Sequence, residues 1–275
     1  MLTALIFGLF GLIIGSFLNV VIIRHGVRGV GGRSACMACG RQLLWYDMLP
    51  VVSWLALRGK CRACKARISV QYPLVEAATA ILFAIIGGSP LPFVAQLFGC
   101  AEAAILVAIA AYDLRHTIIP DAWAYAFAVL AFISQFLAPL PSDLPLVWII
   151  FAGPIAAAPL FAFWLFSGGR WMGLGDAKLA LGIGWLLGPI IGIIAVFFAF
   201  VIGALVSLPL LFFSSKVWKK ISQGFTPTRA LSKSAWGFTM KSEIPFGPFL
   251  ILSCLIVWIS IIHGVDLAGV FGLSL

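Results

Sequence analysis

The chain has 275 residues, of which 63% are hydrophobic and only 10% are charged. This composition excludes an ordinary soluble globular domain and is typical of a polytopic membrane protein. A net charge of +9 would suggest a nucleic-acid partner in a soluble protein. In a membrane protein, basic residues instead indicate which side of the membrane each loop occupies. We therefore expect a lipid bilayer as the environment and no nucleic acid as a partner.

Eight apolar segments predict an all-α polytopic membrane protein with about eight transmembrane helices. The segment 2–23 has no basic residues before it and no small-residue cleavage site, which predicts a span that is retained. Two segments are shorter than the roughly 20 residues that a spanning helix needs, so we expect them to be tilted, flanked by interfacial aromatics or sheltered by neighbouring helices. The expected spans are 2–23, 73–88, 91–112, 121–138, 145–167, 177–188, 190–214 and 244–263.

The lysines and arginines predict the orientation of these spans. With eight spans, all 18 fall on one side of the membrane, and the positive-inside rule makes that side the cytosol. Both termini are then expected outside. The basic residues form three groups: nine between Arg24 and Arg67, three at Arg115, Arg170 and Lys178, and six between Lys216 and Lys241.

Four cysteines form two pairs, Cys36-x-x-Cys39 and Cys61-x-x-Cys64, between the first two expected spans. Two such pairs are the usual ligand set of a structural zinc ion, whose closed shell of four thiolates leaves no open position for catalysis. Two disulfides are the alternative, but such pairs bridge poorly and the cytosol is reducing. We therefore divide the chain into a first span (1–23), a cytosolic zinc-binding loop domain (24–72) and a membrane core (73–275).

Two aspartates stand at cytosolic ends of expected spans, where ionisable groups are costly and therefore functional candidates. Asp113 ends one span, and Asp176 begins another within the sequence Gly-Leu-Gly-Asp. If two such carboxylates meet in a partly dry pocket, one stays ionised and the other keeps a proton. An aspartic protease uses this arrangement, in which the ionised acid activates water and the neutral acid polarises the carbonyl.

Gly173 and Gly175 beside Asp176 are expected to allow backbone conformations and close approaches that a side chain would obstruct. With Lys178 they are the predicted substrate-positioning residues. The alternative for Asp176 is a helix cap, which is also the favoured interpretation of Asp121. A cap is less natural for Asp113, because a negative charge at the end of a helix opposes the helix dipole.

The remaining acids have other expected roles. Glu102 lies eleven residues before Asp113 on the same helix face, and we expect it to point into the bundle in a structural or gating role. Glu76 begins the second span and either contacts a cationic ligand or pairs with an arginine. Glu243 is expected at the start of the last span. His116 is expected to be an exposed loop residue rather than a group that tunes Asp113.

Taken together, these motifs resemble the bacterial type IV prepilin peptidases, also called leader peptidase/N-methyltransferases. The resemblance covers the chain from near its start to the last expected span. It rests on residues 15–22, the two cysteine pairs, and residues 57–64, 68–76, 113–121, 173–178 and 244–248.

The resemblance implies a membrane aspartic protease with Asp113 and Asp176 as its catalytic pair. Such enzymes remove the basic leader of type IV prepilins and type II secretion pseudopilins at the cytosolic face of the bacterial inner membrane. It also implies methylation of the new N-terminal amine with S-adenosylmethionine, an activity associated with the cysteine-bearing region and, in this chain, with Glu76. A transporter, a non-catalytic assembly scaffold and a member that cleaves without methylating are the alternatives.

Overall fold

A computed structural model of the chain describes residues 1–27, 29–138, 145–212 and 245–265. Within these ranges the regular structure is helical and contains no strand, apart from two isolated bridges, Ala35–Gln42 and Lys60–Arg67. The predicted all-α class is therefore confirmed. Glu243 and the basic residues between Lys216 and Lys241 lie outside the described residues.

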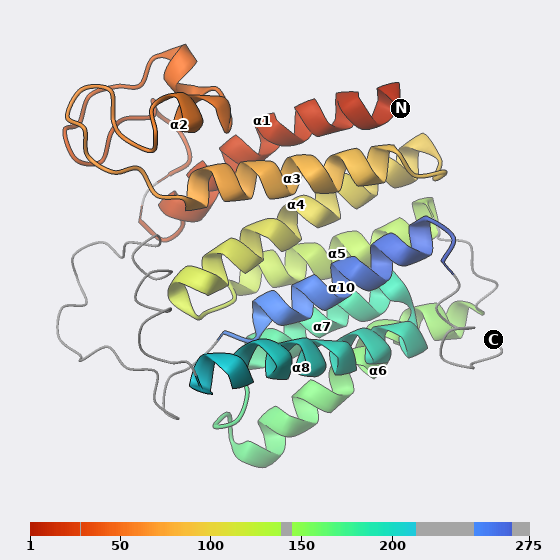
Figure 1. Cartoon of the computed structure of the whole chain (residues 1–275). Helices are drawn as coiled ribbons and strands as arrows, with labels where there is room; N and C mark the ends of the chain where they lie inside the picture. The colour runs from red at the N-terminus through yellow and green to blue at the C-terminus, as the bar shows by residue number, and fades with distance from the viewer. Residues whose placement is uncertain (28, 139–144, 213–244, 266–275) are drawn as a thin grey trace. The chain divides into compact units, whose positions relative to one another are not determined.

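Each expected span coincides with a helix (Figure 1). A 3-10 helix η1 (Trp45–Met48) and a short helix α2 (Val52–Ala56) lie between the first two. The long helices are α1 (Leu2–Arg24), α3 (Gln71–Gly87), α4 (Phe93–His116), α5 (Asp121–Leu137), α6 (Leu146–Ser167), α7 (Leu174–Leu187), α8 (Pro189–Phe212) and α10 (Gly247–Ile262).

Four of these helices are long and apolar enough to cross a membrane: α1, α4, α6 and residues 189–209 of α8. The other four long helices have between 14 and 17 residues. A 14-residue helix is only about 21 Å long, which is short of the roughly 30 Å of hydrocarbon in a bilayer. The described residues thus form a multi-pass membrane protein, and the count of eight spans stays a prediction.

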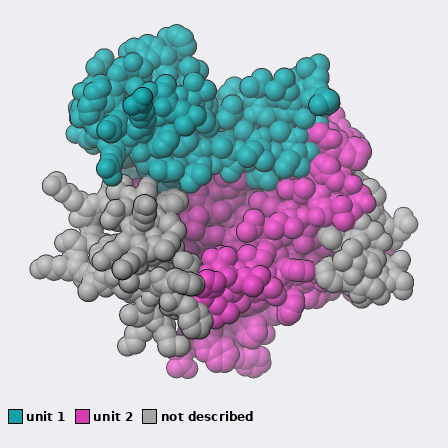
Figure 2. Space-filling model, viewed as in Figure 1, with its two compact units in different colours: residues 1–87, 210–242 teal, residues 88–209, 243–275 magenta. Residues whose placement is uncertain are grey.

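The chain divides into two compact units, which Figure 2 shows in separate colours. Unit 1 contains residues 1–87 and 210–242, and unit 2 contains residues 88–209 and 243–275. Unit 1 therefore holds α1, α3 and the segment between them that carries the four cysteines. Unit 2 holds α4 to α7, residues 189–209 of α8, and α10.

In unit 1, α1 and α3 lie side by side (Figure 1), and α1 presents a row of glycines to α3. Gly8, Gly11 and Gly15 recur at helical spacing, and small residues at this spacing let two membrane helices approach closely. A Cβ on Gly11 would lie 2.8 Å from the Cα of Ala80, and one on Gly15 would lie 2.7 Å from the Cα of Glu76. The glycines thus bring the backbone of α1 into contact with α3.

In unit 2, α7 packs between α5 and α6, so a short helix is surrounded by longer neighbours. The ring of Phe127 on α5 fills the space that a side chain at Gly182 would need. On the other side, Gly184 lies against the backbone of Ala152 on α6. Neighbouring helices therefore surround this short segment as expected, whereas its crossing of the membrane stays a prediction.

The last carbonyls of α7 find partners on α5, which a helix end needs when it is shielded from water. The side-chain amide of Gln135 donates to the carbonyl of Trp185 at 2.6 Å and to that of Leu186 at 3.3 Å. In turn, the indole N–H of Trp185 donates to the carbonyl of Ile150 on α6. The depth of α7 between its neighbours is therefore fixed by hydrogen bonds as well as by packing.

Replacing Gly184 with alanine is expected to destabilise unit 2 by about 1–3 kcal/mol, because the new methyl group would meet backbone atoms that have no room to move. Gly203→Ala on α8 is the matched control. A methyl group there would lie 3.4 Å from the ring of Phe249, and alanine is otherwise the better helix former. Thermal unfolding of the purified protein in detergent checks this, and equal melting temperatures for the two variants would contradict it.

Candidate functional site

Asp113 lies one turn before the end of α4, and its side chain is almost fully buried, with only 3% exposed. Its carboxylate interacts with the backbone N–H of Gly247, the first residue of α10. A Cβ on Gly247 would collide with the Oδ2 atom of Asp113. The start of α10 can therefore lie against this carboxylate only because residue 247 is a glycine.

Asp176 is the third residue of α7 and is 9% exposed. The helix begins after Gly173, whose backbone N–H donates to the Asp176 carboxylate. This is one half of a capping box, in which an acid at the third position reaches back to the residue before the helix. Asp176 therefore stabilises the start of α7, although the N-cap position itself belongs to Gly173.

The structure brings the two predicted acids together. Asp113 and Asp176 lie close enough to repel one another when both are charged, and α10 packs against both α4 and α7. Ile119, which is buried just after α4, fills the space beside them: it would touch a Cβ at Gly175 and at Gly247 at 3.1 Å each. In the described part of the chain, no basic side chain forms an ion pair with either acid.

Two carboxylates in this setting share a proton, because a second negative charge without a counter-ion is costly in a poorly solvated site. The ionised acid can accept a proton from a water molecule, and the protonated acid can donate to a carbonyl oxygen. This geometry supports hydrolysis of a carbonyl compound by activated water without a covalent intermediate.

The four cysteines of unit 1 form a second site. Their sulfur atoms all lie within 4.8 Å of one another, and those of Cys36 and Cys64 are 3.8 Å apart. A tetrahedral zinc ion about 2.3 Å from each sulfur requires the sulfur atoms to be about 3.8 Å from one another. All four thiols are free, so the alternative of two disulfides is not what the structure shows.

The two pairs stand on two equivalent turns. In each turn the first cysteine N–H donates to the carbonyl five residues on, from Cys36 to Arg41 at 2.9 Å and from Cys61 to Ala66 at 2.8 Å. The residue four positions after the first cysteine has a positive φ in both turns: 71° at Gly40 and 58° at Lys65. The same local geometry therefore presents both halves of the ligand set.

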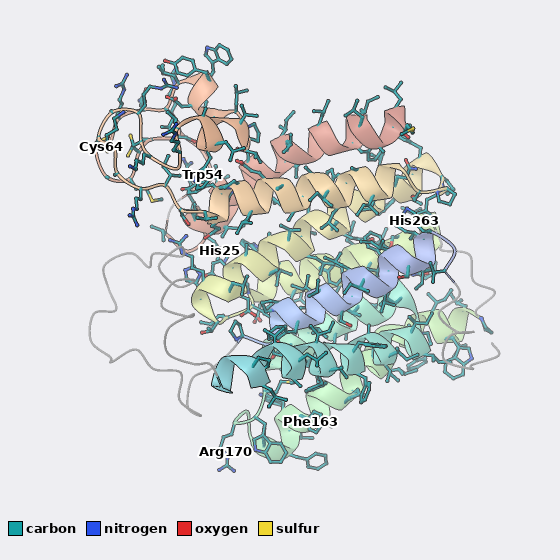
Figure 3. All side chains as sticks on the ribbon, viewed as in Figure 1. His25, Trp54, Cys64, Phe163, Arg170 and His263 are labelled. Carbon is teal, nitrogen blue, oxygen red and sulfur yellow. The ribbon has the colours of Figure 1, made fainter. Side chains whose placement is uncertain are left out.

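Figure 3 shows how the segment between α1 and α3 carries these turns, with Cys64 and Trp54 on it. The ring of Trp54 lies over Gly59, where a Cβ would approach within 2.8 Å, and the indole N–H donates to the carbonyl of Ile68 at 3.3 Å. One tryptophan is a small core for such a segment. The thiol cluster is therefore the main contact that can hold its two turns together.

Proton binding differs between the thiols. Backbone N–H groups of Cys64 and Ala63 point to the sulfur of Cys61 and lower its pKa to about 6. For Cys64, the backbone N–H of Ala66 lowers the pKa, but desolvation and the three neighbouring thiols raise it to about 11. Four sulfurs this close resist ionising together unless a cation lies between them.

Comparisons with known proteins match both units. Residues 9–88 match the bacterial peptidase A24 N-terminal domain, and residues 100–208 match the type IV leader peptidase family. A prepilin leader peptidase/N-methyltransferase of Pseudomonas putida is 30% identical over 299 aligned positions, which cover 92% of this chain and 88% of the relative. The chain belongs to the type IV leader peptidase family.

Two further relatives carry the same name. The protein of Bacillus subtilis strain 168 is 35% identical over 208 positions, covering 72% of this chain and 79% of the relative. The protein of Myxococcus xanthus strain DK1622 is 55% identical over 75 positions, covering 26% of this chain and 22% of the relative. No solved structure shows significant similarity to the chain.

The two sites fall in different parts of the family pattern. Asp113 and Asp176 both lie within the residues that match the type IV leader peptidase family, whereas the four cysteines lie within the N-terminal domain match. Gly247 lies beyond both matches. Residues 244–248 were among those that carry the family resemblance, but the sequence predicted no role for Gly247 itself. Its position between two prolines at the start of an apolar span was the signal available.

The glycines next to Asp176 have ordinary backbone conformations, and only Gly175 has a close neighbour, Ile119. Gly173 is extended, with φ −73° and ψ 147°, and Gly175 lies in α7, so neither needs a positive φ. Lys178 is turned to α5: its Nζ lies 2.7 Å from the Oδ1 of Asp121 and 5.4 Å from the ring centre of Tyr125. A role of these three residues in positioning a substrate stays a prediction.

Other acids and a histidine of unit 2 lie away from this pair. Asp121 is not an N-cap, since Pro120 holds that position, and it begins α5 as the ion-pair partner of Lys178. Glu102 is buried on α4 as predicted and interacts with Ser134 on α5. His116 is exposed as predicted but is the last residue of α4 rather than a loop residue, and its ring stacks on Tyr112 at 4.2 Å.

Zinc affinity of this family member is expected to rise with pH. Zinc binds four thiolates, so its binding releases any proton that a thiol still carries. With a pKa of about 11, Cys64 carries a proton at neutral pH, and with a pKa of about 6, Cys61 carries one only in more acidic solution. The affinity should change roughly tenfold per pH unit for each proton released. Zinc titration at several pH values measures this. Cys64→Ser should lose the ion and Cys100→Ser, on α4, should keep it; a pH-independent affinity would contradict the assignment.

Proposed function

We propose that this protein is a membrane aspartic endopeptidase that removes the leader peptide of type IV prepilins or type II secretion pseudopilins. The observation that carries the proposal is the pair of buried carboxylates, Asp113 and Asp176, held together on α4 and α7 by α10. The relatives named above are prepilin leader peptidases. The site would act at the cytosolic face of the bacterial inner membrane, with both termini outside.

In the proposed mechanism a water molecule lies between the two carboxylates. The ionised acid takes a proton from this water as it attacks the scissile carbonyl carbon, and the neutral acid donates a hydrogen bond to the carbonyl oxygen. The backbone N–H of Gly247 holds the Asp113 carboxylate, and that of Gly173 holds the Asp176 carboxylate. Because both acids are fixed before substrate arrives, little reorganisation is needed during the reaction.

The entrance to Asp176 suits an extended peptide. Gly173 is exposed and extended, and even a Cβ at this position would lie 3.6 Å from the Oδ2 of Asp176. A substrate backbone can therefore pass this point without meeting a side chain. Lys178 acts indirectly in this proposal, since its ion pair with Asp121 joins the start of α7 to the start of α5.

We further propose that unit 1 N-methylates the new N-terminus and that Glu76 belongs to this second site. S-adenosylmethionine would supply the methyl group from its sulfonium centre. The residues present fit a cationic reactant, since Glu76 is a buried carboxylate and the nearby Asn19 has an oxygen without a donor. The zinc ion would have a structural role, holding the two cysteine turns together. The domain boundary between residues 72 and 73 stays a prediction.

Asp113→Asn and Asp176→Asn are each expected to lower the rate of leader removal by roughly 10³-fold or more, because one member of an acid–base pair acting as a unit is lost. Mass spectrometry of a purified prepilin incubated with the enzyme in detergent measures this. Asp47→Asn, which changes an acid paired with Arg62 in unit 1, is the control and should cleave normally. Full cleavage by either site variant would refute the proposed dyad.

Gly247→Ala is expected to reduce cleavage about 100-fold, because the new methyl group displaces the Asp113 carboxylate and misplaced catalytic groups lose about this much rate. The melting temperature should stay close to that of the wild type, since the change is made in the first turn of α10. Gly203→Ala again serves as the control for a glycine replacement that touches no carboxylate. Unchanged cleavage by Gly247→Ala would show that this contact does not position Asp113.

A further inference from the structure

A layer of polar side chains interrupts the contact between α1 and α3 in unit 1, where α1 nears its end and α3 begins. Polar groups between apolar membrane helices are costly and usually functional. Four of the five members are buried and Ser16 is half-buried: the layer comprises Ser16, Asn19, Gln71, Glu76 and Thr79. None of them takes part in the aspartate pair or in the cysteine cluster.

Within this layer, Asn19 has one side-chain atom without a hydrogen-bond partner. Its side-chain NH₂ donates to the carbonyl of Gly15 at 3.3 Å and to that of Tyr72 at 3.1 Å. These two acceptors fix the orientation of the amide, because exchanging its nitrogen and oxygen would place the side-chain oxygen against two carbonyl oxygens. Its Oδ1 atom is then a buried acceptor that receives no hydrogen bond, in a residue that is 1% exposed.

Gln71, the first residue of α3, has the complementary defect: its Nε2 atom is buried and donates to no acceptor, and the residue is 4% exposed. Buried polar atoms of native proteins nearly always have partners, so an orphaned acceptor and an orphaned donor at one place call for a ligand or an ordered water. Thr79 lacks this feature, because its hydroxyl donates to the carbonyl of Val75 at 2.7 Å.

Glu76 already shows which kind of group suits the layer. Its Oε2 accepts a hydrogen bond of 2.7 Å from the backbone N–H of Val51, and Ser16 also donates to the carboxylate. Val51 has a φ of 59°, which is strained for a β-branched residue. A buried carboxylate without a basic partner among the described residues is thus covered by a strained N–H donor.

We propose that Ser16, Asn19 and Glu76 form a binding site for an α-ammonium group, with Val51 as its cover. The inference deepens the proposed N-methylation and rests on it. An ammonium group offers three N–H donors and a positive charge, which match the Glu76 carboxylate and the free Oδ1 of Asn19. It would replace the N–H of Val51, which lets that residue leave its strained conformation as the ligand enters.

Two reactants of an N-terminal methylation carry such a group: the new N-terminus of the cleaved substrate and the amino-acid end of the methyl donor. Binding experiments on the full-length, zinc-loaded protein distinguish them. The probes are S-adenosylhomocysteine, which keeps the donor's ammonium group, and a peptide of the mature prepilin N-terminus with its amine either free or acetylated. Calorimetry in detergent gives the affinity of each probe.

Glu76→Gln and Asn19→Leu are the test variants, and Thr79→Val is the matched control at the same interface. Glu76→Gln keeps the volume and an oxygen that can accept from Val51, so it removes the charge without removing the packing. Both test variants are expected to lose at least about tenfold in affinity for one probe, the effect of one charge-assisted hydrogen bond. Zinc content of both test variants should stay within twofold of the wild type, and so should zinc content and leader cleavage of the Thr79→Val control.

A loss confined to S-adenosylhomocysteine places the donor in the site, and a loss confined to the free-amine peptide places the substrate there. The inference is overturned if both test variants bind both probes as the wild type does, if Thr79→Val shows the same loss, or if the wild type binds neither probe. Failure of the proposed function itself looks different, because the wild type would then bind probes without cleaving or methylating any prepilin.

Discussion

The close approach of a backbone glycine to a buried carboxylate is the contact on which the aspartate pair depends. Gly247 brings the start of α10 against Asp113, and α10 also packs on α7, which carries Asp176. Buried between helices, a carboxylate needs hydrogen-bond donors, and here backbone N–H groups supply them. Such donors cannot rotate away as a side chain can. The acid pair is therefore placed by the helix backbones rather than by flexible partners.

Much of this arrangement could be predicted from the sequence. Apolar runs marked the eight long helices because their limits are set by composition, and the cysteine spacing marked the cluster because two turns of fixed length present the ligands. Asp113 and Asp176 stood out because acids are rare in such a chain. Each of these signals is local and can be read without knowing which helices meet.

The features that the sequence did not reveal all depend on contacts between distant segments. Gly247 matters only because α10 returns to the end of α4, and nothing in its own neighbourhood shows that. Lys178 looked like a substrate contact, yet its partner Asp121 is 57 positions away in the chain and on another helix. The sequence left Asp176 as either a cap or a catalytic acid, and its third position in α7 lets the side chain accept from Gly173 while it lies near Asp113.

The shortness of α7 has a consequence for any substrate. A helix of about 21 Å in a hydrocarbon layer of about 30 Å creates a hydrophobic mismatch, so the end that bears Asp176 cannot reach the level of the lipid headgroups if the other end lies at the opposite surface. In the proposed function, the aspartate pair then lies several ångströms below the level of the headgroups. The carbonyls of a helical substrate are hydrogen-bonded along its own axis, so none of its peptide bonds is open to attack at that depth. In this proposal the last turn of the substrate helix unwinds before cleavage, and binding at the aspartate pair supplies the energy for it.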